Sequence, residues 1–519
     1  MIPNSARRPL MAIAVTATTM LVAGVAPGDS RVAGFRMARG VAELFVDDTL
    51  IESQKGVSQT LHAPTKDDGG SKPILAIEDE FGPNTSTLEA NGSIVWDPRL
   101  KKWVMFALGF APTYNGPSGD KTRLFRFTSP DGLKWTKGDD GRAERIAIDL
   151  HDPVSGADAT NVDVFSCCYN ARDTNFPYQG WLWFANWGPG REGAYFMRSR
   201  DGRKWERGAM IVSADDGRVE QDGRLLRGAG DVTTLYQDPL ESRFLALVKY
   251  ASPTEVGPGN RLRARAYTFV DRLDARLDLT KVRRVDLVPA AAEANGDHPH
   301  DEYYAATAWR YGSQWLGGLK VWHGGGDHPY SAAGCAYLKL VSSRDGLHWS
   351  KVKFPGVGGE PEVWLPNGKE GGESGRNDGG YLTEFSQGPI RIGDELIYYY
   401  GCSSFGKNHP RGVRVTGGGI FRARLRVDGF VSVNTGSLTT RPLTFDGSDL
   451  RVNARGPIRV DLLDPSGKQL GSAEIRGGSI RHRVRFGGKG IQQLAQRSPV
   501  KLRFTVGPDA LLYSYQSDE

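Results

Sequence analysis

The 519-residue sequence has little cysteine, and its four cysteines form no metal-binding pattern. Cys167 and Cys168 are adjacent inside an apolar run, which favours buried thiols. Cys335 and Cys402 stand alone, and a disulfide between them stays open. Structural zinc sites need ligands paired at short spacing, so the cysteines predict no zinc site.

Long basic runs and long apolar runs are also missing from most of the chain. Its 66 Lys and Arg residues are interspersed with 60 Asp and Glu residues, and the net charge of +6 is small for this length. Nucleic-acid binding needs a concentrated basic face, so we expect no nucleic-acid partner.

Beyond the N-terminal segment no stretch approaches the roughly 18 apolar residues of a membrane-spanning helix, so we expect no membrane span. We expect no cofactor, and the sequence leaves the oligomeric state open.

Residues 1–26 form a separate segment. Arg7 and Arg8 precede an uncharged stretch from Leu10 to Val25, which threonines interrupt and small residues end. A short apolar stretch with these flanks is typical of a secretory signal peptide rather than of a membrane span. The two arginines leave a twin-arginine signal open. We therefore expect an exported protein, periplasmic or extracellular, after cleavage of the signal peptide.

What the sequence does contain is a repeated motif, Ser-x-Asp-Gly-x-x-Trp. Three copies occur, at residues 129–135, 199–205 and 343–349, and each follows a segment typical of a strand. Ser and Asp side chains bond to nearby backbone amides, glycine supplies a positive φ, and the tryptophan can fold back over the turn. The motif therefore predicts a structural turn at a strand exit, on the outer rim of the fold.

The spacing of these turns predicts the architecture. Asp131 and Asp201 are 70 residues apart, and Asp345 follows Asp201 by 144 residues, about two further units. A degenerate copy ends at Asp271 and the last copy at Asp428, which makes five units. A period of this length, with several short strands per unit, is typical of radial repetition. The sequence therefore predicts a five-bladed β-propeller, with a sandwich or mixed fold and coincidental turns as the alternative.

The chain is too long for one ordinary core, and its pattern changes after residue 436. Later segments such as 458–463 alternate strictly between apolar and polar residues, so each strand buries one face. We predict an all-β chain with the propeller over residues 40–436 and a C-terminal β-sandwich over residues 437–519. Residues 43–52 are typical of a strand and a turn, and we expect them to complete the last blade.

An acidic residue stands at the predicted leading end of the innermost strand of every blade. In a propeller these ends meet at one mouth of a central funnel. Any single acid is more often a solvated strand end, but several like charges in a narrow funnel are destabilising unless a ligand or a cation uses them. Glycosidic bond cleavage needs two carboxyl groups in different environments, one protonated and one ionised. The acids are Glu89, Asp163, Asp231, Asp301 with its neighbour Glu302, and Glu384.

The five units, the strand-exit turns, the opening Leu44-Phe45-Val46-Asp47-Asp48 and the segment 441–447 together resemble exported glycoside hydrolases with a five-bladed propeller, related to families 32 and 43. The resemblance covers nearly the whole mature chain. Those families place Asp, Asp and Glu on the inner strands of blades one to three. The matching positions are Glu89, Asp163 and Asp231, so the residue types differ. Stretches like Trp-Met-Asn-Asp-Pro-Asn-Gly, Arg-Asp-Pro and Glu-Cys are absent, so fructan or sucrose is not favoured as the substrate.

The sequence thus predicts an exported hydrolase, a glycosidase that cleaves a polysaccharide or oligosaccharide with funnel carboxylates. We expect catalysis from Glu89, Asp163 and Asp231. Asp231 follows Gly228-Ala229-Gly230 and precedes a buried strand, so desolvation and nearby acids are expected to raise its pKa and make it the general acid. The alternative is a non-catalytic carbohydrate-binding propeller. The side chains expected to bind the substrate are Asp301, Glu302, Glu384, His300 and Trp322.

Two other clusters have a plainer explanation. Residues 297–302 contain two histidines, and His323 and His328 follow the next strand, a donor set that a metal could use. A polar loop that binds sugar hydroxyls or caps the strand is favoured, and no metal site is predicted. The arginines within residues 261–265 alternate along one strand, so a solvated face of an outer strand is favoured over a carboxylate-binding cluster.

Overall fold

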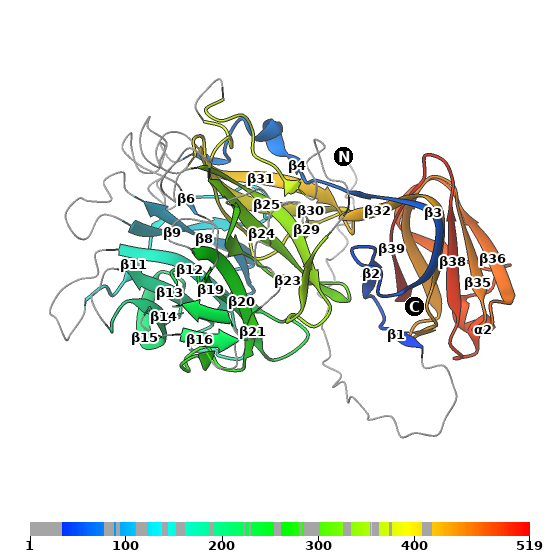
Figure 1. The fold of residues 1–519 in the computed structure, drawn as a ribbon, viewed down its shortest axis with the longest axis horizontal. Coiled ribbons are helices and arrows are strands. Elements are labelled where there is room, and N and C mark those ends of the chain that lie inside the picture. Colours follow the sequence, from blue (N-terminus) through cyan, green and yellow to red (C-terminus); the bar gives the residue numbers. More distant parts are fainter. Residues whose placement is uncertain are drawn as a thin grey trace, which may run out of the picture.

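The protein consists of a large lobe of five sheets and a smaller lobe built mainly on one further, nine-stranded sheet (Figure 1). Among the residues that the structure describes, no helix is long and apolar enough to cross a membrane. The computed structural model describes residues 34–76, 88–89, 94–110, 122–137, 144–151, 161–185, 190–214, 216, 218–221, 224–227, 230–253, 261–279, 283–284, 301–324, 334–352, 354, 363–372, 376–406 and 418–519.

The five sheets follow one another along the chain, and each is built on three main antiparallel strands: an innermost first strand, which is in two pieces in blades one, four and five, a second strand that pairs with it, and a third strand that pairs with the second. Blade one contains β6 (Leu88–Glu89), β7 (Ile94–Asp97), β8 (Lys102–Phe110), β9 (Thr122–Ser129) and β10 (Glu144–Arg145). Blade two contains β11 (Ala147–Ile148), β12 (Asn161–Tyr169), β13 (Tyr178–Ala185), β14 (Gly193–Ser199) and β15 (Lys204–Ser213). Blade three contains β16 (Arg218–Gln221), β17 (Arg224–Arg227), β18 (Thr234–Gln237), β19 (Phe244–Pro253), β20 (Arg261–Val270) and β21 (Arg283–Arg284).

Blade four contains β22 (Asp301–Ala306), β23 (Trp309–Tyr311), β24 (Gln314–Gly324), β25 (Gly334–Ser343), β26 (Trp349–Lys351) and β27 (Val363–Leu365). Blade five contains β28 (Leu382–Phe385), β29 (Ile390–Ile392), β30 (Glu395–Ser403) and β31 (Gly418–Arg426). The first, second and third strands are β6 with β7, β8 and β9 in blade one; β12, β13 and β14 in blade two; β18, β19 and β20 in blade three; β22 with β23, β24 and β25 in blade four; and β28 with β29, β30 and β31 in blade five. This arrangement confirms the five-bladed β-propeller predicted from the spacing of the turns.

An N-terminal segment closes the ring of blades. The strands β4 (Thr65–Lys66) and β5 (Leu75–Ala76) both pair antiparallel with β31, on either side of the 3₁₀ turn Asp67–Gly70. Lys66 Nζ lies 2.5 Å from the buried Asp378 carboxylate of blade five. Blade five therefore takes its outermost strands from the start of the chain, which leaves the propeller without a long exposed edge there.

The segment predicted to complete that blade, residues 43–52, belongs instead to the smaller lobe. β2 (Ala42–Leu44) pairs with the last strand of the chain, and β3 (Ile51–Leu61) pairs with β32 (Val431–Thr440). Figure 1 shows these dark blue strands beside the orange and red ones. The prediction was wrong because the alternating pattern fits an edge of either sheet, and only the long-range pairing distinguishes them.

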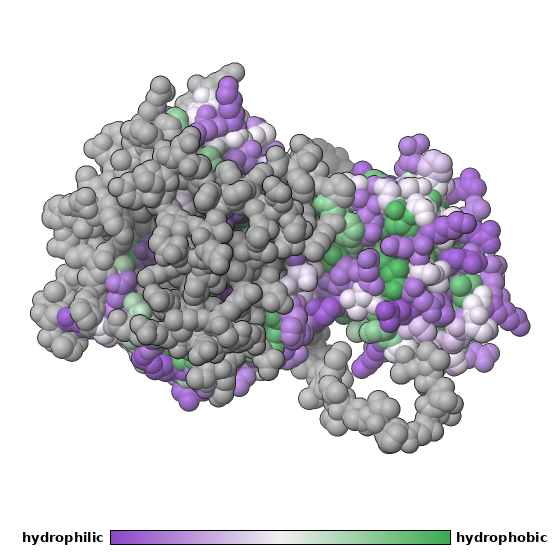
Figure 2. All heavy atoms as spheres, viewed as in Figure 1, coloured by the Kyte–Doolittle hydropathy of each residue, from purple (hydrophilic) through white to green (hydrophobic). Residues whose placement is uncertain are grey.

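The smaller lobe is a sheet with the pairing order β36-β35-β38-β32-β39-β34-β37, and β36 and β37 approach each other, so it curls back on itself. Because its strands form one hydrogen-bonded sheet, this pairing does not show the predicted two-sheet sandwich. In Figure 2, hydrophilic side chains cover much of its visible face, with hydrophobic residues between them. The other strands of this sheet are β34 (Asp449–Arg455), β35 (Ile458–Leu463), β36 (Gln469–Ile475), β37 (Gly478–Val484), β38 (Lys501–Val506) and β39 (Leu511–Asp518). Beside it, β1 (Phe35–Met37) and β33 (Leu443–Phe445) form a separate two-stranded sheet, and the helix α2 spans Ile491–Ala495.

The repeated turns lie after the third strand of blades one, two and four, away from the first strands. Asp345 Oδ1 accepts hydrogen bonds from the amides two and three residues ahead, both at 2.8 Å, and Gly346 has a φ of 78°. Trp349 donates from Nε1 to the Gly346 carbonyl at 2.7 Å, and its ring stacks on Tyr267 of blade three at 4.9 Å. The predicted structural role of the motif is confirmed.

The other two tryptophans also pack between neighbouring blades. Trp205 lies 5.6 Å from Phe106 of blade one, and Trp135 lies 5.3 Å from Tyr399 of blade five, with the rings edge to face in both cases. Aromatic pairs in this geometry add to the stability that their burial supplies. The motif therefore joins adjacent blades as well as turning the chain.

Candidate active site

The predicted leading ends of the first strands lie at the same end of their blades. Glu89 of β6 pairs with Leu108, Asp163 of β12 with Trp183, and Asp301 of β22 with His323, each near the end of the second strand. Asp231 precedes β18, and the amide of Gly230 beside it donates to the Lys249 carbonyl of β19 at 3.0 Å. Glu384 lies on β28 beside Phe385, which pairs with Tyr400. The backbone therefore brings these acidic positions to one end of the five first strands.

Three of these strands are irregular beside their acid. The pairing register shifts between Asp163 and Phe165, between Tyr303 and Ala305, and between Leu382 and Phe385. Val164 in the first of these bulges has a φ of 33°, which is rare and strained for a β-branched residue. Bulges of this kind occur next to active sites, where they re-aim a side chain.

Asp163 is half-buried, between the buried residues Val162 and Val164. Its carboxyl group is therefore partly removed from water while its backbone lies in the bulge. The side chains of Glu89 and Glu384 lie outside the described part of the structure, as does all of His300.

Asp231 forms an ion pair with Lys249, and the Asp231 side chain is 36% exposed while that of Lys249 is 15% exposed. Asp231 Oδ1 also accepts a hydrogen bond from the Val232 amide at 3.0 Å. An adjacent ammonium group stabilises the ionised carboxylate. The predicted role of Asp231 as general acid does not fit this pair, because a general acid must hold its proton.

Gly230 makes the ion pair possible. A Cβ atom at this position would overlap with the Cε atom of the Lys249 side chain. The group that approaches Gly230 closely is therefore the lysine of the neighbouring strand.

Three of the residues expected to bind substrate are buried. Asp301 and Glu302 are 1% and 2% exposed, and Trp322 is 1% exposed and packs edge to face on Tyr304 at 6.1 Å. The Tyr337 hydroxyl lies 3.5 Å from Asp301 Oδ2. Trp322 therefore has no open ring face for a sugar, and it is a core residue of blade four.

Two lysines on second strands of the blades, Lys249 and Lys320, were not predicted from the sequence. Lys320 is 2% exposed, donates to the Tyr381 hydroxyl at 2.9 Å and lies 4.7 Å from the centre of the Tyr304 ring. Each lysine follows apolar residues inside a strand, in Leu-Ala-Leu-Val-Lys249 and Leu319-Lys320-Val321. A lysine inside such a run is the signal that could have identified them, because it must find a buried partner.

Two other predictions from the sequence have a structural outcome. Arg265 is 1% exposed, so its predicted place on a solvated face is wrong. The strand β20 pairs on both sides, with β19 and β21, inside blade three.

All four cysteines are free, and Cys167 and Cys168 are buried, as predicted. Burial raises the pKa of the Cys168 thiol to about 12.

No group of three or more metal-ligating side chains occurs within the described residues. The loop at residues 297–300 and His328 lie outside them, and the side chain of His323 is not described. The described residues therefore do not test whether the histidines and acids around blade four could bind a metal.

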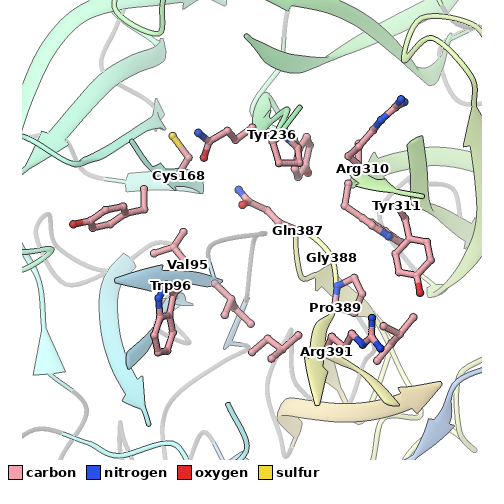
Figure 3. Close-up of a pocket in the computed structure, with 18 of the residues that line it drawn as sticks. Val95, Trp96, Cys168, Tyr236, Arg310, Tyr311, Gln387, Gly388, Pro389 and Arg391 are labelled. Carbon is pink, nitrogen blue, oxygen red and sulfur yellow. The ribbon is translucent and has the colours of Figure 1, made fainter. Parts of the chain in front are cut away.

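A cavity of about 650 Å³ lies at the other end of the first strands (Figure 3). Its lining includes residues near the ends of these strands, among them Trp96, Tyr236, Trp309 and Gln387, and none of the predicted site residues lines it. Gln387 points into the middle of this view. The cavity is therefore separate from the acidic ends.

The structural similarities of this chain to known proteins are distant. No protein-family model and no curated protein matches the sequence. Among solved structures, one titled "Glycoside hydrolase" is 13% identical, covers 70% of this chain and 92% of that chain, and has a TM-score of 0.43. A glycoside hydrolase family 43 arabinoxylan arabinofuranohydrolase from Bacillus subtilis is 12% identical, covers 88% and 99%, and has a TM-score of 0.37. The GH32 beta-fructofuranosidase of Bombyx mori is 8% identical, covers 84% and 91%, and has a TM-score of 0.38.

These similar structures are glycoside hydrolases, but at such TM-scores and identities the likeness carries no argument. The description of this chain as a five-bladed propeller rests on its own strand pairing.

Proposed function

We propose that this protein is an exported glycoside hydrolase that cleaves a polysaccharide or oligosaccharide at the acidic end of its propeller. The observation that supports this most strongly is the meeting of Glu89, Asp163, Asp231, Asp301 and Glu384 at one end of five first strands. The bulges beside three of these acids add to it, because such irregular pairing can re-aim a side chain next to an active site. Export is supported by the sequence of residues 1–26.

The ion pair with Lys249 supports an ionised Asp231, so we assign it the role of base or nucleophile. The proton donor to the leaving oxygen is then another carboxyl group, either Glu89 or Asp163. Asp163 is half-buried beside a bulge of its strand, which makes it a candidate for this role. An ionised Asp231 and a protonated second carboxyl group would form the pair that glycosidic cleavage requires.

The test is a screen of the purified mature protein against a panel of plant and microbial polysaccharides and oligosaccharides, with release of reducing ends as the readout. Hydrolysis of at least one glycan is expected, and it should be lost in Asp231→Asn. Asp271→Asn, an exposed acid after the third strand of the same blade, is the matched control and should keep full activity. Hydrolysis that Asp231→Asn leaves intact would remove this residue from the mechanism.

A non-catalytic carbohydrate-binding propeller is the second candidate, because the burial of Asp301 leaves fewer carboxyl groups open for the acid and base roles of hydrolysis. Binding of a glycan without release of reducing ends, in wild type and Asp231→Asn alike, would favour this candidate over hydrolysis.

A further inference from the structure

A second cavity lies at the junction of blade five and the smaller lobe. It has a volume of about 480 Å³, which falls within the range of small-molecule sites. One wall comes from β31 and the turn before β30, and the other from the ends of β3, β34 and β39. Its lining includes His62, Asp394, Arg424, Arg426, Arg455 and Tyr513.

Two arginines of this cavity have no carboxylate within ion-pair distance among the described residues. Arg426 donates from Nε and Nη2 to the amide oxygen of Asn453, at 3.1 and 2.9 Å, and this acceptor is neutral. Arg455 is exposed, and its side chain makes no hydrogen bond or ion pair with any residue that the structure describes. The cavity therefore contains two guanidinium charges that no ion pair neutralises.

The neighbouring carboxylates are already used or lie farther away. Glu395 pairs with Arg424 at 3.2 Å, and Asp428 pairs with Arg481 at 3.1 Å. Asp394 attracts Arg426 without reaching ion-pair distance. Positive charge from Arg426 and Arg455 is therefore in excess within the cavity.

The two arginines also repel each other across the cavity. Burial lowers the pKa of Arg426, and the charge of Arg455 lowers it further. The same two causes, in the same order, lower the pKa of His62. The Arg426 guanidinium lies 5.3 Å from the centre of the Tyr513 ring, which limits how it can turn away. An anion between the two guanidinium groups would remove this repulsion.

We propose that this cavity binds an oxyanion, a carboxylate or sulfate group, carried by an acidic sugar or present as a free ion. A guanidinium group presents paired N–H donors that match the oxygens of a carboxylate or a sulfate. The volume exceeds that of a free ion, which favours an acidic sugar. The site shares no residue with the acidic ends of the first strands, so it does not depend on the proposed hydrolysis.

Isothermal titration of the mature protein at low salt tests the proposal with four probes: glucuronate, glucose 6-sulfate, inorganic sulfate and neutral glucose. Saturable binding of the two acidic sugars is expected, and none of glucose. Arg455→Ala should weaken that binding about tenfold, since a charge-assisted hydrogen bond is lost. Inorganic sulfate that binds as tightly as both acidic sugars would identify the free oxyanion as the ligand.

Arg476→Ala is the matched control, because Arg476 is also on the smaller lobe, is 81% exposed and pairs with Glu474. Its binding should stay at the wild-type value, and Asp231→Asn should also bind as wild type. Arg455 is exposed, so Arg455→Ala should keep the thermal midpoint of wild type. The proposal is overturned if no anionic probe saturates the wild type, or if Arg455→Ala and Arg476→Ala weaken binding equally.

Discussion

Gln387 of blade five donates a hydrogen bond from Nε2 to the carbonyl oxygen of Cys167 in blade two, at 2.9 Å. The same nitrogen lies 3.3 Å from the carbonyl oxygen of Leu235 in blade three. Ser166 Oγ of blade two also donates to this Leu235 oxygen, at 2.8 Å. One amide side chain therefore connects three blades at the centre of the propeller.

Gln387→Leu should lower the free energy of unfolding by about 1–3 kcal/mol, because the carbonyl oxygens of Cys167 and Leu235 each lose a partly buried donor. Chemical denaturation of the purified protein measures this. Gln237→Leu is the control, since Gln237 is exposed at the end of β18 in blade three. Equal stability of the two variants would contradict a structural role for the central amide.

Asp231→Asn should lower kcat by a factor on the order of 10² to 10⁴, the usual size of a lost acid or base step. The thermal midpoint should change little, because the side chain is partly exposed. Steady-state kinetics on the best glycan of the panel, with a thermal melt, separate the two effects. A substrate with a leaving group that needs no proton should not rescue this variant, whereas it should rescue a variant of the proton donor.

Gly230→Ala should displace Lys249 from Asp231, because the added methyl group occupies the space of the Lys249 side chain. We expect kcat to fall on the order of 10-fold to 10²-fold through misplacement of the carboxylate, with folding intact because a lysine side chain can move. Gly478→Ala is the control, since a methyl group there would make only ordinary contact. Unchanged kcat in Gly230→Ala would show that the ion pair does not position the carboxylate for catalysis.

Trp349→Ala should lower the free energy of unfolding by about 3–5 kcal/mol, the usual cost of removing a large buried aromatic side chain. Trp349 is 3% exposed and seals the contact of blades three and four. Trp96 is 40% exposed, and Trp96→Ala should cost about 1 kcal/mol or less. Denaturant titration compares the two, and similar losses would refute the sealing role of the motif.

The Asp345 turn should make stability depend on pH in acid. Burial by itself would raise the pKa of Asp345, but hydrogen bonds from the amide and the ring of His348 outweigh it and lower the pKa to about 2. The carboxylate therefore contributes stability that is present above its unfolded pKa of about 3.9 and is lost as the pH falls toward about 2.

Thermal midpoints of wild type and Asp345→Asn, measured from about pH 5 to about pH 2, test this dependence. The wild-type midpoint should fall more steeply in that window, so the two curves should converge. Parallel curves would show that the turn does not depend on the charge of Asp345.

Short-range chemistry explains which parts of the fold could be predicted. The turns at Asp131, Asp201 and Asp345 depend on groups within a few residues, so their sequence is sufficient to identify them. Their spacing then predicted five blades. The acidic positions followed from the same alignment of repeats, because equivalent residues of repeated units lie at equivalent ends.

Long-range pairing explains what could not be predicted. Residues 43–52 have a pattern that fits either lobe, and the pairing of β2 and β3 placed them in the smaller one. Arg265 alternates like a solvated residue, but strands on both sides of β20 bury it.

The sequence by itself determined the turns, the number of blades and the acids at the start of each first strand, because these depend on neighbours along the chain or on the repeat. Only the tertiary structure decided the charge partners of those acids. Lys249 meets Asp231 across two strands, and Arg426 and Arg455 meet across two lobes. Electrostatic interaction depends on distance in space, and no local pattern records which distant side chains the folded backbone brings together.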